Sequence, residues 1–213
     1  MTDPKDFEGN SYQNIQIGEQ IWLTQNLNTS KFINGDEINE AKTIDEWVRA
    51  GSNKSPAWCY YNSDPNNGPI YGKLYNWFAF SDPRGFLNPN WRIPDEKDWE
   101  ILTNFINGKD PSLRITFFEN WLNSTGVKYE NTIGGLGGFR HRAPNRMNDK
   151  GEFFGLNEDG HWFSNSKLED TENWEGHPDV WTRYVHKNKL ELTRPHSDMR
   201  DGCSIILVSY TKY

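Results

Sequence analysis

The sequence predicts one α+β domain spanning residues 1–213, in which small antiparallel sheets and two to three short helices are joined by long loops. Three observations carry this prediction. The length of 213 residues fits a single domain. Aromatic residues make up 15% of the chain, with ten Trp, so large rigid side chains are available to fill a compact core. The 18 Gly and 11 Pro are scattered rather than clustered, which is typical of many turns rather than of a helical bundle.

The chain opens with a predicted β-hairpin over residues 12–27. Apolar and polar residues alternate on both sides of a reversal at Gly18-Glu19, as expected for two half-buried strands. The apolar positions are Ile15, Ile17, Ile21 and Leu23.

A short helix is expected over residues 43–50. Thr43 is suited to the N-cap, and Glu46 three residues later completes a capping box. Gly51 is expected to stop the helix.

The next segments combine a strand, a turn and a buried helix. Residues 58–61 read as a strand that runs into the turn-forming residues 63–69. Residues 74–80 are apolar and aromatic without two-residue alternation, which favours a buried helix.

The clearest helix follows Pro94. Asp95 is the expected N-cap and Asp98 the third helical residue, a variant of the capping box. The helix should end at Asn107-Gly108, and another is expected over residues 111–122. The inward stripe of the first comprises Trp99, Leu102, Phe105 and Ile106.

Between residues 126 and 200 the chain reads as short β-like pieces between polar turns. Residues 204–208 are nearly all apolar and predict a buried strand. The expected pieces are a bend at 134–140, a turn at 157–160, a strand at Trp162-Phe163, and a hairpin of 181–185 with 189–192.

Charge and hydropathy exclude several classes of partner. The net charge of −7 argues against nucleic acid, which requires clustered Lys and Arg, and against anionic membrane surfaces. No apolar run approaches the ~20 residues of a membrane-spanning helix.

The polar start at Met1 favours a cytoplasmic location, or an exported protein whose signal has been removed. Cys59 and Cys203 are expected to be buried thiols outside any disulfide.

Several motifs, in a shared order, resemble the bacterial Fibrobacter succinogenes major paralogous domain (FISUMP). The two central pairs of segments carry most of the resemblance, and the opening hairpin and last strands add to it. These motifs are Ala57-Trp58-Cys59-Tyr60-Tyr61-Asn62 with Gly72-Lys73-Leu74-Tyr75-Asn76-Trp77, Asn90-Trp91-Arg92-Ile93-Pro94-Asp95 with Lys97-Asp98-Trp99-Glu100-Ile101-Leu102, and further on Gly137-Gly138-Phe139-Arg140 and Gly160-His161-Trp162-Phe163-Ser164.

The resemblance implies a C-type-lectin-like fold, which formylglycine-generating enzymes share. In that layout the N- and C-terminal strands pair and loops in the second half carry the ligand. The family often has two cysteines where this chain has Asn88 and Leu207, so both partners of the implied disulfide are absent together. Their absence favours a reducing compartment.

The function expected from this fold is non-catalytic recognition of a protein or glycan through the loop-rich C-terminal half. Trp, Tyr and Arg anchor interfaces, and polar neighbours can bond sugar hydroxyls. Trp174 matches no motif and lies in a polar segment, so it is the expected exposed anchor. The candidate ligand-binding residues are Trp174, Arg183, Tyr184, Asp159, His161, Arg194, Asp198 and Arg200.

Two alternatives stay open, although no catalytic residues and no cofactor are expected. Loop oxygens of Asn157, Glu158 and Asp159 are of the kind that binds Ca²⁺. An enzyme of the formylglycine-generating type would need a cysteine pair near the chain end, where only Cys203 is found. Neither the ligand nor the oligomeric state follows from the sequence.

Overall fold

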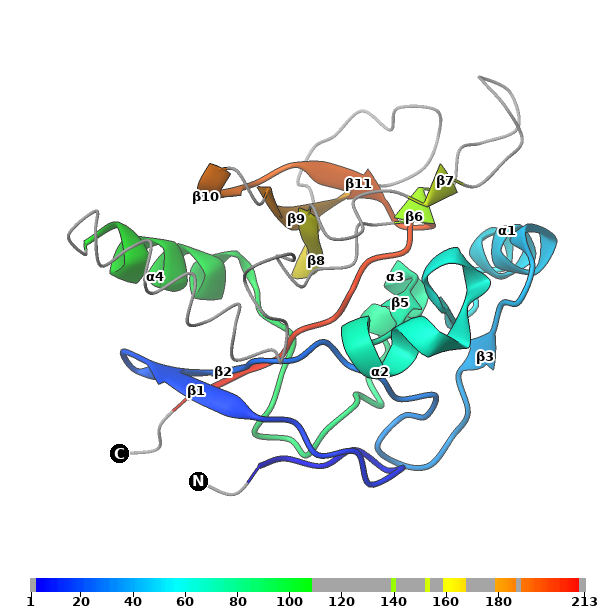
Figure 1. The fold of residues 1–213 in the computed structure, drawn as a ribbon, viewed down its shortest axis with the longest axis horizontal. Helices are drawn as coiled ribbons and strands as arrows, with labels where there is room; N and C mark the ends of the chain where they lie inside the picture. Colours follow the sequence, from blue (N-terminus) through cyan, green and yellow to red (C-terminus); the bar gives the residue numbers. More distant parts are fainter. Residues whose placement is uncertain are drawn as a thin grey trace.

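The computed structural model describes residues 3–108, 139–140, 152–153, 159–167, 179–186 and 189–210. These residues form a mixed α+β structure with small, largely antiparallel sheets and few short helices (Figure 1). The helix expected over 111–122 and most of the bend at 134–140 lie outside the described residues.

The first sheet joins the two ends of the described chain. Strands β1 (Asn14–Ile17) and β2 (Gln20–Leu23) form the expected hairpin, and Gly18 adopts the positive φ that its reversal requires. Strand β12 (Val208–Tyr210) pairs antiparallel with β2, which gives the order β1-β2-β12. The predicted hairpin and the predicted pairing of terminal strands are both confirmed.

The second sheet has the order β3-β4-β5 and lies beside helix α1. Its strands are β3 (Asn39–Glu40), β4 (Ala57–Cys59) and β5 (Leu74–Tyr75), with β3 parallel and β5 antiparallel to β4. Helix α1 (Ile44–Ser52) begins with the predicted capping box. The predicted stop at Gly51 is wrong, because this glycine lies inside the helix. The side chain of Arg200 packs against it, and a Cβ at this position would lie 3.0 Å from Arg200 Cγ.

The prediction of one helix over residues 74–80 is also wrong. Residues 74–75 are β5, and only α3 (Trp77–Phe80) is helical. Asn76 separates the two because its side chain accepts a hydrogen bond from Ala79 N at 3.0 Å and another from Ala57 N at 3.1 Å. The same amide thus caps a helix and holds a strand, which periodicity does not reveal.

Three short helical turns occupy residues 61–71, where the sequence predicts turns at residues 63–69. They are η1 (Tyr61–Ser63), η2 (Pro65–Asn67) and α2 (Gly68–Tyr71). Helix α4 (Glu96–Asn107) follows as predicted, and Asp95 and Asp98 exchange reciprocal hydrogen bonds at its start (2.8 and 3.0 Å).

The third sheet comprises β8 (Asp159–Lys167), β9 (Asp179–His186), β10 (Lys189–Thr193) and β11 (His196–Asp198), all antiparallel to the central β9. The predicted hairpin of 181–185 with 189–192 is therefore confirmed. The predicted turn at 157–160 is wrong for residues 159–160, which belong to β8 and pair with β9. A separate pair joins β6 (Phe139–Arg140) to β7 (Glu152–Phe153).

Helix α4 lies between the first and third sheets (Figure 1). The ring of Trp99 on α4 packs at a tilt against that of Trp22 on β2, with centroids 4.9 Å apart, and its centroid lies 6.3 Å from that of Trp162 on β8. Residues 204–208 are buried as predicted, but only Val208 belongs to a strand. The rest of this run forms no strand, because its residues bond to several different elements. Ser204 bridges to Trp162 of β8, and the carbonyl of Ile205 accepts a hydrogen bond from Leu27 N.

Candidate functional site

Two of the expected binding residues, His161 and Tyr184, pack against each other within the third sheet. His161 of β8 faces Tyr184 of β9, and their rings are 5.9 Å apart at the centroids. His161 is only 3% exposed, and its Nε2 shares a hydrogen bond with Thr182 Oγ1 at 2.9 Å. Its ring therefore contributes to sheet packing.

Arg183 and Arg194 converge on Glu96 at the start of α4. Arg183 is buried and its guanidinium lies 2.7 Å from Glu96 Oε2, which Arg194 also contacts. The Arg194 guanidinium stacks 3.6 Å above the Trp181 ring centroid and stays half-exposed. Sequence reasoning missed Glu96, whose only signal was its place in the first turn of a helix.

Asp198 and Arg200 form a separate unit beside α1. Asp198 Oδ1 accepts hydrogen bonds from Arg200 N at 2.7 Å and Nε at 2.9 Å, and Oδ2 lies 2.6 Å from Nη2. Trp47 of α1 donates to Arg200 O at 2.8 Å. This pair fixes the chain after β11 against α1.

The side chains of the remaining expected residues lie outside the described part of the structure. Trp174, Asn157 and Glu158 lie outside the described residues, and only the backbone of Asp159, at the start of β8, is described. Within the described ranges no three His, Cys, Asp or Glu side chains gather closely enough to hold a metal ion. The described helices also include none that is long and apolar enough to cross a bilayer.

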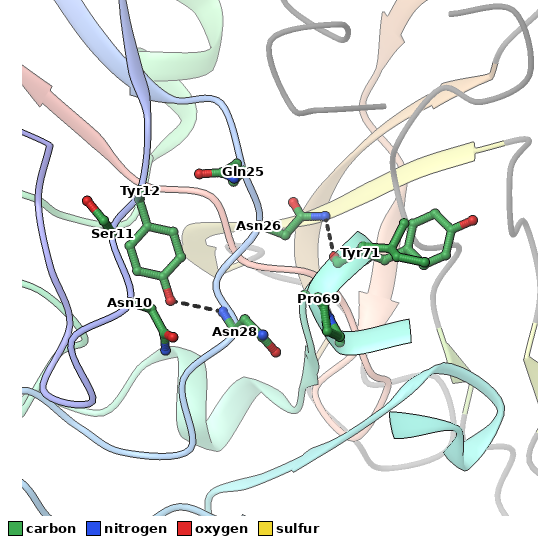
Figure 2. A pocket seen from close by; sticks show the side chains of 11 residues that line it. Asn10, Ser11, Tyr12, Gln25, Asn26, Asn28, Pro69 and Tyr71 are labelled. Carbon is green, nitrogen blue, oxygen red and sulfur yellow. Dashed lines mark hydrogen bonds between the residues drawn. The ribbon is translucent and has the colours of Figure 1, made fainter. Parts of the chain in front are cut away.

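The described residues contain a polar pocket far from those residues in sequence. Its volume is about 190 Å³, and three segments form its walls: residues 10–12, 25–28 and 68–72 (Figure 2). We call it the polar pocket. It is lined by Asn10, Ser11, Tyr12, Gln25, Asn26, Asn28, Gly68, Pro69, Ile70, Tyr71 and Gly72.

Tyr12 joins the first two walls. Its hydroxyl donates to Asp6 Oδ2 at 2.7 Å and accepts from Asn28 N at 3.1 Å. Burial, together with the negative charge of Asp6, raises the pKa of the Tyr12 phenol far above its usual value. The phenol therefore stays neutral and acts as a fixed hydrogen-bonding strut.

Asn26 joins the pocket to α2 and to the third sheet. Its Nδ2 donates to Tyr71 O at 3.0 Å, as Figure 2 shows, and its Oδ1 accepts from Trp162 Nε1 at 2.9 Å. Since both ends of the amide are engaged, Asn26 holds the pocket wall in one position.

Two glycines allow α2 to approach the second wall. A Cβ on Gly68 would lie 2.5 Å from Tyr60 Cε1, and one on Gly72 would lie 2.6 Å from Leu27 O. Gly72 also has φ +80°, which side-chain-bearing residues rarely adopt. The pocket thus depends on two glycines four residues apart.

Behind the second wall lies Lys73, which is 5% exposed. Its Nζ donates to Asn28 O at 3.2 Å and lies 4.0 Å from the Trp58 ring centroid. Burial lowers the pKa of this ammonium group, although the carboxylates of Glu8, Glu40 and Asp6 oppose the effect. Lys73 supports the wall without lining the pocket.

The lining is uncharged. Among its eleven residues, all within the described part of the chain, none is Asp, Glu, Lys, Arg or His. Ile70 at the rim is 57% exposed and adds an apolar edge. Such a site can donate and accept hydrogen bonds, but it offers no group that exchanges a proton near neutral pH.

The sequence predicts a turn over residues 63–69, which includes Gly68 and Pro69, but it does not predict this site. The available signal was the pair of glycines flanking Pro69-Ile70-Tyr71 together with the amide-rich run at 25–28. Nothing in the sequence states that these segments meet.

Comparison with known families matches the Fibrobacter succinogenes major domain over residues 15–205. The chain belongs to this family. The match includes the second and third walls of the polar pocket and starts just after the first wall. No curated protein and no solved structure matches the chain.

Proposed function

We propose that this member of the Fibrobacter succinogenes major domain family is a non-catalytic recognition module that binds its ligand in the polar pocket. The observation that carries the proposal is the uncharged, amide- and hydroxyl-bearing lining. Recognition needs convergent hydrogen-bonding groups, whereas catalysis needs an acid, base, nucleophile or metal at the ligand.

The fixed positions of the wall residues support this proposal. Asn26 is bonded at both ends of its amide, and Tyr12 bridges Asp6 and Asn28. A wall that is held in place before binding loses little conformational entropy when the ligand arrives.

The fold to which we assign the chain is C-type-lectin-like. Support comes from the pairing of β12 with β2, which brings the two ends of the described chain together, and from the two longer helices that precede the third sheet. In this layout the polar pocket lies beside the N-terminal sheet rather than in the C-terminal half.

The surface of the third sheet is a second candidate for recognition, in this case of a protein. Arg194 is half-exposed and stacks on Trp181, and such Arg–aromatic pairs are common interface anchors. This surface keeps the C-terminal half in the proposal, with Arg183 as a supporting residue because it shares Glu96 with Arg194.

An oxidative enzyme is the less favoured alternative. Cys203 is 1% exposed, and its backbone exchanges hydrogen bonds with Tyr75 at 2.9 and 3.0 Å. Burial raises the pKa of the Cys59 thiol far above its usual value. Buried thiols of this kind are poor nucleophiles, which weighs against a reaction centred on them.

The test is an NMR titration of isotope-labelled protein with a panel of soluble oligosaccharides and peptides, combined with mass spectrometry of each compound afterwards. We expect at least one compound to shift backbone signals of residues 10–12, 25–28 and 68–72 and to be recovered intact. Chemical conversion of the bound compound would contradict the proposal, as would shifts confined to other surfaces.

A further inference from the structure

We propose that the ligand of the polar pocket is a single residue of an uncharged glycan. This inference rests on the proposed function and adds the chemical class of the ligand. Four features of the described residues support it: the uncharged lining of the pocket, the hydrogen-bonding groups of that lining, the backbone groups of the walls that are already bonded, and the volume of the pocket.

The first feature is the contrast in charge between the pocket and the whole chain. Charged residues make up 25% of the sequence, and yet none lines this cavity. A charged ligand would lose water without gaining an opposite charge, which disfavours its binding in a partly enclosed site.

Charged side chains near the walls are already engaged. Asp6 accepts hydrogen bonds from Asn10 N, Asn10 Nδ2 and Tyr12 Oη at 2.7 to 2.9 Å. Glu8 accepts from Ser30 N and Oγ at 2.6 Å and from Thr29 Oγ1 at 2.9 Å. Lys73 is stacked against Trp58 behind the wall. These charged side chains stabilise the walls. The cavity itself has an uncharged lining and therefore suits a neutral ligand.

The second feature is the hydrogen-bonding chemistry of the lining. Side-chain amides both donate and accept, as sugar hydroxyls do, so either partner can adapt its roles to the other. Asn28 Oδ1 is buried and accepts no hydrogen bond in the protein. Figure 2 shows its amide between Tyr12 and Pro69. When the amide turns toward the pocket, a ligand donor would satisfy this oxygen directly or through water.

The third feature argues for a sugar rather than a peptide. Peptides commonly bind by adding a strand to an open sheet edge. In the second wall, Leu27 N already donates to Ile205 O at 2.9 Å, and Leu27 O accepts from Lys73 N at 2.9 Å. In the first wall, Tyr12 N donates to Pro4 O at 3.0 Å. Apart from Asn26, whose amide is engaged at both ends, the side-chain amides and hydroxyls of the lining therefore present the readiest groups, and these match sugar hydroxyls better than an extended main chain.

The fourth feature is size. The pocket volume of about 190 Å³ is below the roughly 300–1,000 Å³ that is usual for drug-sized ligands. One sugar ring is a reasonable occupant, while the rest of a glycan would extend into solvent. Pro69 and the exposed Ile70 form an apolar edge on which the C–H face of a ring can pack.

The experiment is an NMR titration with three sets of probes: neutral monosaccharides and their short oligomers, uronic and sialic acids, and short uncharged peptides. It compares the wild type with Gln25→Glu, which adds a charge at the pocket but keeps the oxygen that accepts from Gln13 N at 3.0 Å. Gln16→Glu on β1 is the matched control, because Gln16 is exposed and outside the lining. A second pair is Ile70→Ser, with Ile44→Ser on α1 as its control.

We expect a neutral sugar to bind and to shift pocket signals. Both Gln25→Glu and Ile70→Ser should weaken its binding, the former by about tenfold, which corresponds to the loss of one well-placed hydrogen bond. Both control variants should bind as the wild type does.

The outcomes separate this inference from the proposed function. If an acidic sugar or a peptide occupies the pocket in preference, recognition stands and the inference of a neutral sugar fails. The inference also fails if no neutral sugar binds, or if Gln25→Glu and Ile70→Ser both bind it unchanged. If no probe of any class shifts pocket signals, the pocket is not the recognition site and both proposals fail.

Discussion

Arg92 and Asp98 form a bidentate ion pair that ties the loop before α4 to the helix itself. The Nη1–Oδ2 and Nη2–Oδ1 distances are 2.5 and 2.6 Å. The Asp98 side chain is fully buried, and Tyr210 Oη also donates to it at 2.6 Å. Because Arg92 exchanges backbone hydrogen bonds with Val208, this one carboxylate joins the loop, α4 and the last strand.

Replacing Arg92 by leucine should lower the free energy of unfolding by about 3 kcal/mol. The variant leaves a buried carboxylate without its counter-charge, and the half-exposed arginine places the loss at the low end of the range for buried pairs. Urea unfolding measures the change. Lys31→Met is the control, since Lys31 pairs with the largely exposed Glu37 and should cost under about 1 kcal/mol. Similar losses in both variants would contradict the assignment.

Gly72→Ala should destabilise the protein more than Gly9→Ala does. Both glycines have positive φ, at +80° and +87°, so both substitutions introduce backbone strain of about 1–2 kcal/mol. Only at Gly72 would the new Cβ also meet Leu27 O at 2.6 Å, whereas nothing lies within 4 Å at Gly9. Thermal unfolding of the two variants compares them directly, and equal shifts would show that the contact with Leu27 is unimportant.

The buried Lys73 should make stability depend on alkaline pH. Its pKa in the folded protein is below the usual 10.5, because burial disfavours the charged form. Between the folded and unfolded pKa values the unfolded chain binds more protons, so this group makes unfolding less favourable as pH rises. Below that window the charged form carries the full cost of burial.

Lys73→Met removes this contribution. The difference in unfolding free energy between variant and wild type should therefore change with pH on approach to 10.5, in favour of the wild type. Urea unfolding from pH 7 to pH 10.5 follows the difference, with the exposed Lys97→Met as control. A difference that stays constant with pH would show that burial does not perturb Lys73.

Much of the local structure could be predicted from the sequence. The capping boxes at Thr43 and Asp95, the reversal at Gly18 and the hairpin of β9 with β10 all depend on residues a few positions apart. Prediction failed at residues 74–80, where Asn76 bonds to Ala57 across the sheet as well as capping α3. A contact from outside the segment decided its structure there.

The expected binding residues illustrate the same limit. Arg183 is an expected interface anchor and His161 an expected ligand-binding residue, but the structure buries both. Their burial depends on α4 and on the neighbouring strand, and no pattern within β8 or β9 encodes it. The polar pocket was missed for the same reason, since its three walls come from separate segments.

The sequence by itself determined the α+β class, the family, the main turns and caps, and the pairing of the terminal strands. These follow from local backbone preferences and from a recognisable order of motifs. Only the tertiary structure decided which side chains meet: Arg92 with Asp98, Asn26 with Trp162, and an uncharged pocket beside a buried lysine. The physical reason is that burial and hydrogen-bond partners depend on contacts between distant segments, whereas periodicity and capping record only neighbours along the chain.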